Sequence, residues 1–242
     1  MEDFNMTNMN KNMFTDDELF ENPAKRVPVS LCLDTSYSML SPESDPASSE
    51  KTTRIALLNK GVRMFADEVR GDEIARYAAD ISVVTFNSEV RKDLEFGDVE
   101  KLSRIREFSA DGNTHLGEGV NQALDLLEAR KKQYQMAGVE YYQPWLVLMT
   151  DGLPNGDPKE LRRAADRIST MTANQKLTVF PIAIGKDADL EVLRKFAPGM
   201  EPLRLEGMHF GRFFTWLSQS VAAVANDSLD VLSPENLRAL CA

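Results

Sequence analysis

The stretch LCLDTSYSML, residues 31–40, joins an apolar run to a short polar sequence. The run Val27 to Leu33 is rich in Val and Leu, which is typical of a strand that is covered on both faces. It ends at Asp34, and two hydroxyls follow at alternate positions, Ser36 and Ser38. Ligands of open α/β sheets bind at the carboxyl ends of the strands. The stretch therefore predicts a central strand that leads into a binding site.

Strand and helix patterns alternate along the rest of the chain. Further apolar runs predict strands at 81–86, 145–150, 177–184 and 203–205, and the charged, alternating segment 90–96 predicts an exposed edge strand. Apolar residues spaced by three and four predict helices that contain residues 55–69, 116–127, 161–168 and 213–224, with a short one at 189–196. We therefore predict an α/β fold with a mainly parallel central sheet, one antiparallel edge strand and helices on both faces.

Composition shifts divide the chain into three parts. Residues 1–26 are rich in Asn, Met, Asp and Glu without a sustained period, which predicts a flexible arm with at most one helical turn at 16–20. The domain is predicted to cover residues 27–226, and residues 227–242 are predicted to form a tail with at most one short helix. The Ser/Pro/Glu-rich segment 41–53 is predicted to be an inserted loop without helix or strand.

The net charge, the first residues and the length of the apolar runs argue against several classes of protein. The net charge is −10, from 28 Lys and Arg against 38 Asp and Glu, and no dense basic cluster supports nucleic-acid binding. The first residues lack the basic start and apolar run of a signal peptide. No apolar run approaches the roughly 20 residues that span a bilayer. We therefore predict no nucleic-acid partner, no membrane span and a cytoplasmic location.

Polar residues follow three segments that are expected to meet at one edge of the sheet. These are Asp34, Ser36 and Ser38 after the first strand, Thr114 within SADGNTHLGEG (109–119), and Asp151 directly after the strand 145–150. Two carboxylates and three hydroxyls make an all-oxygen set, which suits a hard divalent cation. Mg²⁺ is the first expectation, and Mn²⁺ and Ca²⁺ stay open.

In their order and spacing, these residues resemble the metal-ion-dependent adhesion site of von Willebrand factor A (vWA) domains. Asp34, Ser36, Ser38, Thr114 and Asp151 match D-x-S-x-S, the loop threonine and T-D-G in turn. The phrases RVPVSLCLDTSYSM, YYQPWLVLMTDGLPNGD, VFPIAIGKDADLEVLRKFAP and FGRFFTWLSQSVAAVA resemble bacterial TerY-like proteins associated with tellurite resistance. The chain departs from many members at Tyr37, where they have glycine, and in the longer 41–53 segment.

The resemblance implies a Rossmann-like fold and a protein-binding module rather than an enzyme. It implies that Ser36, Ser38 and, with ligand bound, Thr114 contact the metal directly, while Asp34 and Asp151 act through water. An open coordination position would then take a carboxylate of a partner protein. TerY-like relatives occur in stress-response systems, which implies such a setting here.

Two other functions stay open. The metal site would be structural or vestigial if the chain served only as a scaffold. A Mg²⁺-dependent phosphohydrolase would use Asp34 as nucleophile, but such chemistry usually wants a second acid two residues on, where this chain has Ser36. Taken singly, the same residues also suit ordinary turns and helix caps. His115 lies beside the site without a nucleophile to activate, so a loop role is the simpler interpretation.

Overall fold

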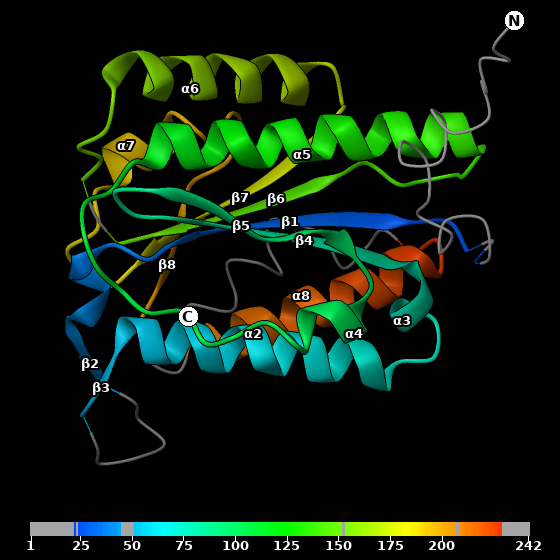
Figure 1. Ribbon diagram of the computed structural model, residues 1–242, viewed down its shortest axis with the longest axis horizontal. Helices are drawn as coiled ribbons and strands as arrows, with labels where there is room; N and C mark the ends of the chain where they lie inside the picture. Colours follow the sequence, from blue (N-terminus) through cyan, green and yellow to red (C-terminus); the bar gives the residue numbers. More distant parts are fainter. Residues whose placement is uncertain (1–21, 23, 45–50, 152, 207–208, 229–242) are drawn as a thin grey trace, which may run out of the picture.

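A six-stranded sheet forms the centre of the protein (Figure 1). The computed structural model describes residues 22, 24–44, 51–151, 153–206 and 209–228. The strand order is β5-β4-β1-β6-β7-β8, and every neighbouring pair is parallel except β4 with β5. The strands are β1 (Val27–Asp34), β4 (Ala79–Phe86), β5 (Val90–Gly97), β6 (Trp145–Thr150), β7 (Thr178–Ile184) and β8 (Leu203–Leu205). The predicted α/β class and the antiparallel edge strand are confirmed.

Helices cover both faces of this sheet, as Figure 1 shows. Alternate residues of β1 point to opposite faces, so Leu31 and Leu33 join one apolar core and Cys32 joins the other. The first core lies under α2 (Arg54–Gly71), α3 (Ala75–Ala78), α4 (Val99–Leu102) and α8 (His209–Ala225). The second lies under α5 (Leu116–Ala137), α6 (Pro158–Ala173) and α7 (Leu190–Arg194).

Local signals account for the ends of the long helices. Asp157 caps α6 by accepting from the backbone N–H of Lys159, and proline follows at the first helical position. Gly138 ends α5 in the left-handed conformation, with φ of 67°. The helices α3 and α4 were not predicted, because four residues are too few to show a helical period.

The prediction for segment 41–53 was partly wrong. Its two ends pair as a short antiparallel hairpin, β2 (Pro42–Ser44) with β3 (Lys51–Thr53), after the 3₁₀ turn η1 (Tyr37–Leu40). A three-residue strand has no room for apolar alternation, so its sequence gives no strand signal. Residues 45–50 lie outside the described residues.

Most of the predicted arm and tail also lies outside the described residues. This applies to residues 1–21, 23 and 229–242, including both short helices expected there. Arg26, at the end of the predicted arm, is buried and donates from its guanidinium to the carbonyl of Tyr77 at 2.6 Å. The boundaries at 27 and 226 stay predictions.

Candidate metal centre

The site lies at the carboxyl end of β1, where the strand order changes direction. The chain passes from β1 to β4 on one side, and β6 later pairs with the other side of β1. Such a switch point leaves a crevice between the loops that follow the two strands. The parallel register of Leu33 with Met149 brings the next residues of both strands, Asp34 and Thr150, to the same level.

Asp34 is fully buried and held by two donors. One carboxylate oxygen accepts from the backbone N–H of Ser36 at 2.8 Å, and the other accepts from the hydroxyl of Thr150. Burial raises the pKa of Asp34 to about 6, although the bonds from Ser36 and Thr150 favour its charged form. The carboxylate is therefore oriented in advance, in surroundings that favour a nearby positive charge.

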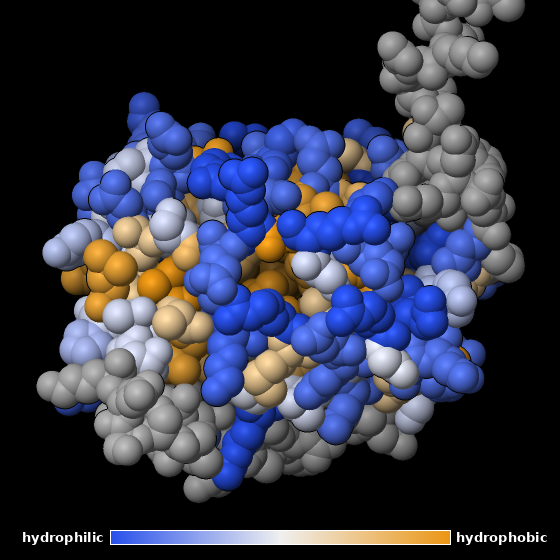
Figure 2. All heavy atoms as spheres, turned by 60° about the horizontal axis from the view of Figure 1, so that its bottom comes forward, coloured by the Kyte–Doolittle hydropathy of each residue, from blue (hydrophilic) through white to orange (hydrophobic). Residues whose placement is uncertain are grey.

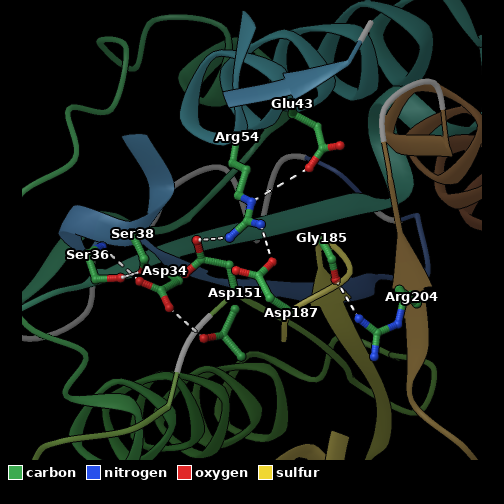
Figure 3. A network of polar contacts seen from close by, with 10 residues as sticks. Asp34, Ser36, Ser38, Glu43, Arg54, Asp151, Gly185, Asp187 and Arg204 are labelled. Atoms are coloured by element: carbon green, nitrogen blue, oxygen red, sulfur yellow. Dashed lines mark hydrogen bonds and ion pairs between the residues drawn. The ribbon is translucent and has the colours of Figure 1, made fainter. Parts of the chain in front are cut away.

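The two serine hydroxyls lie between this carboxylate and Asp151 (Figure 3). Ser36 Oγ lies 3.0 Å from Ser38 Oγ, and Ser38 donates to Asp151 Oδ1 at 2.5 Å. The structure thus brings four of the predicted residues, Asp34, Ser36, Ser38 and Asp151, into one hydrogen-bonded chain. The alternation within D-x-S-x-S places both hydroxyls on the same side of the turn.

Thr114 is buried in the adjoining loop and stands apart from that chain. Its backbone N–H donates to Asn155 Oδ1 at 2.7 Å, and the Asn155 N–H donates to the Thr114 carbonyl at 3.1 Å. The Tyr37 N–H donates to the Gly112 carbonyl at 3.0 Å, which ties this loop to the D-x-S-x-S turn. Within the described part of the chain, Thr114 makes no side-chain hydrogen bond to the other four predicted residues.

The sequence interpretation missed Arg54, the first residue of α2. Its guanidinium is buried and donates to Asp151 Oδ2 at 2.9 Å and to Asp187, and its Nε lies 3.6 Å from Glu43 Oε2. Figure 3 shows the guanidinium between these three carboxylates. Gly185 lies against it, since a Cβ there would meet the guanidinium at 2.4 Å.

The charges of this cluster stabilise one another. Burial alone would lower the pKa of Arg54, but Asp151 and Asp187 raise it above its usual value. Partial burial alone would raise the pKa of Asp187, but the bond from Arg54 lowers it. A signal for Arg54 was present in the sequence, because a cation at a helix N-terminus opposes the helix dipole unless an acid compensates it.

The donor set fits a small hard cation. Across the described residues, no group of three or more His, Cys, Asp or Glu side chains could hold a metal, so a cation here would rely on two carboxylates and on hydroxyls. Neighbouring ligands of Mg²⁺, each about 2.1 Å from the ion and at right angles, lie about 3.0 Å apart. The oxygens of Ser36 and Ser38 have this separation, 3.0 Å.

A mainly parallel sheet of this strand order, with helices on both faces, defines a Rossmann-like α/β domain. The chain belongs to the von Willebrand factor type A domain family, whose profile matches residues 29–210. No curated protein matches the chain at a significant level.

Solved structures share the fold at low sequence identity. The conserved hypothetical protein BatB from Bacteroides thetaiotaomicron is 16% identical, with a TM-score of 0.55 over 84% of this chain and 100% of its own. The vWF domain of the type V pili tip protein Mfa5 from Porphyromonas gingivalis is 13% identical, with a TM-score of 0.59 over 84% and 97%. The PilB minor pilin from Streptococcus sanguinis is 14% identical, with a TM-score of 0.57 over 87% and 64%. These matches show the fold alone.

Among the helices of the described residues, none combines the length and apolar character needed to cross a membrane.

Proposed function

We propose that this chain is a metal-dependent protein-binding module and not an enzyme. Asp34, Ser36, Ser38, Thr114 and Asp151 would hold Mg²⁺, with Mn²⁺ or Ca²⁺ as substitutes, and a partner protein would supply a carboxylate to the ion. The observation that carries the proposal is the oxygen chain, by which we mean the side-chain oxygens of Asp34, Ser36, Ser38 and Asp151. Hydrogen bonds join them in this order, the first through the backbone N–H of Ser36. Bound there, the cation would supply a positive centre with an open position for an acidic ligand.

The hydrogen bonds support distinct roles for the five residues. Ser36 and Ser38 have the separation of two direct ligands. Asp34 and Asp151 each accept hydrogen bonds from neighbouring protein groups, which fixes the direction of their carboxylates. Carboxylates fixed in this way suit a role in which they accept from metal-bound water. Thr114 sits in a loop tied to the same turn, which suits a ligand that engages only when a partner binds.

The biological setting is a further part of the proposal. Membership of the vWA family and fold relatives among pilus proteins support a protein-interaction role. The bacterial stress-response setting, of tellurite-resistance type, rests on the four sequence phrases given above. The cytoplasmic location rests on the composition of the first residues. Identification of the partner tests both the stress-response setting and the cytoplasmic location.

The first test measures the metal requirement directly. Isothermal titration of the intact protein with Mg²⁺, Mn²⁺ and Ca²⁺ is compared with Asp34→Ala, Ser38→Ala and the control Ser41→Ala, whose hydroxyl lies outside the oxygen chain. We expect binding to be lost in the first two variants and retained in the control. Equal binding in all of them would refute the proposed site.

The second test measures partner capture. The intact protein and Thr114→Ala retrieve proteins from native extract in Mg²⁺ and in EDTA. A partner held by the intact protein in Mg²⁺ alone supports the adhesion function. Equal capture in every arm would favour the scaffold alternative, in which the metal does not take part in binding. Turnover of a generic phosphate ester that depends on Asp34 would favour the phosphohydrolase alternative.

A further inference from the structure

Large apolar side chains are exposed around the proposed metal site. The described residues expose six large hydrophobic side chains, and three of them lie within two residues of a proposed metal ligand. These are Tyr37, Leu40 and Leu153, which are 67%, 42% and 64% exposed. Single exposed apolar residues are ordinary, but a group of them beside a binding site indicates an interaction surface.

The other three exposed hydrophobic residues lie at the opposite end of the sheet. Ile74 and Tyr77 precede β4, and Met136 is near the end of α5, which starts at the site and runs away from it. They supply matched controls, because they have similar size and exposure but lie far from the oxygen chain.

Tyr37, Leu40 and Leu153 belong to the two segments that carry Ser36, Ser38 and Asp151. Tyr37 lies between the two serines, and Met39 in the same turn is fully buried, which leaves Leu40 on the outer side. The bond from Ser38 to Asp151 joins this turn to the segment that carries Leu153. Figure 2 shows apolar side chains gathered at its left edge, the end of the molecule at which Figure 1 places η1.

The charges of the site limit what can occupy this surface. Without a metal, the site holds four carboxylates, Asp34, Glu43, Asp151 and Asp187, against the single guanidinium of Arg54, and this excess of negative charge repels an acidic ligand. The chain as a whole carries a net charge of −10. Arg54 does not attract one either, because its guanidinium is buried and already bound to Asp151 and Asp187. An acid at this point therefore needs the metal to offset these charges, and the exposed apolar side chains of Tyr37, Leu40 and Leu153 lie close to it in the chain.

We propose that Tyr37, Leu40 and Leu153 form an apolar collar that selects the partner. The occupant is a protein segment in which the metal-binding Asp or Glu is flanked by large aliphatic or aromatic side chains. The acid binds the cation, while the side chains that flank it in the partner segment pack against the collar and are removed from water. This inference rests on the proposed metal-dependent function and adds the sequence character of the ligand.

The test uses two peptide probes that share one acid. Each carries a central aspartate, flanked by leucines in one probe and by glycines in the other, and each carries a fluorescent label. Dissociation constants come from fluorescence anisotropy with the full chain, in Mg²⁺ and in EDTA. We expect the leucine-flanked probe to bind at least about 5-fold more tightly in Mg²⁺, the effect of one well-packed interface side chain.

Two variants and two controls distinguish binding at the collar from non-specific hydrophobic binding elsewhere on the protein. Tyr37→Ser and Leu153→Ser should each weaken the leucine-flanked probe at least about 5-fold and leave the glycine-flanked probe unchanged, by the same interface magnitude. Tyr77→Ser and Met136→Ser should change neither. The same variants are titrated with Mg²⁺ to show that the metal site is intact.

The outcomes distinguish the collar from the metal function itself. Equal Mg²⁺-dependent binding of both probes would overturn the collar and leave the metal function standing. Binding of the leucine-flanked probe that persists in EDTA, or with asparagine in place of its aspartate, would also overturn the collar as a selector of acidic ligands. Failure of both probes together with failure of Mg²⁺ titration would overturn both proposals.

Discussion

Replacement of Arg54 by methionine would remove the only cation that contacts the carboxylate of Asp151 in the described structure. Methionine keeps most of the side-chain volume, so the change isolates the charge and its hydrogen bonds. The Arg54 and Asp151 side chains are 6% and 0% exposed, and their atoms lie 2.9 Å apart. The variant would therefore leave a buried carboxylate that keeps Ser38 as a donor but has lost its cation.

The expected loss of stability comes mainly from this one pair. Breaking a buried ion pair by removing one partner costs about 3–5 kcal/mol. The contact with Asp187 adds little, because that carboxylate is 63% exposed, and the contact with Glu43 is 3.6 Å long. Because Ser38 still donates to Asp151, we expect Arg54→Met to lower the free energy of unfolding by about 3 kcal/mol, the lower end of that range.

Urea unfolding of the apoprotein and of the variant measures this value. The matched control is Arg63→Met, which removes an ion pair with Glu107 whose side chains are 56% and 71% exposed, so its loss should be at most about 1 kcal/mol. Mg²⁺ should restore more stability to Arg54→Met than to the unchanged protein, because the ion brings positive charge to the same carboxylate. An Arg54→Met loss no larger than that of the control would refute this account of the cluster.

Two further predictions concern packing and reactivity. Gly117→Ala should destabilise the protein by about 1–3 kcal/mol in the same urea assay, which is the usual effect of overpacking. The added Cβ would lie 2.3 Å from the backbone N of Leu161. The control Gly71→Ala should not destabilise the protein, because a Cβ there would meet nothing within 4 Å. A neutral result at Gly117 would show that α6 moves freely away from α5. Burial raises the pKa of the Cys32 thiol, so in a Cys241→Ser background iodoacetamide at mildly alkaline pH should label the protein only after unfolding. Labelling of the folded protein would show that β1 opens locally.

The strands were predictable wherever burial on both faces required a continuous apolar run. For this reason β6 was predicted with its observed bounds, Trp145–Thr150, and β1 ended within one residue of its predicted end at Leu33. The edge strand β5 was recognisable by charges that alternate with apolar residues. The hairpin of β2 and β3 was not, because its pairing depends on the fold that brings residues 42–44 and 51–53 together.

The sequence by itself determined the class of fold and the oxygens of the candidate site. Asp34, Ser36 and Ser38 belong to one turn, so local spacing places them together, and the end of β6 places Asp151 beside them once the sheet is parallel. Only the tertiary structure decided that Arg54 binds Asp151 and Asp187, which are 97 and 133 residues away. Helical and strand periods record which face of an element is buried, but not the order of the strands. That order decides which loops meet, and therefore which charges neutralise one another.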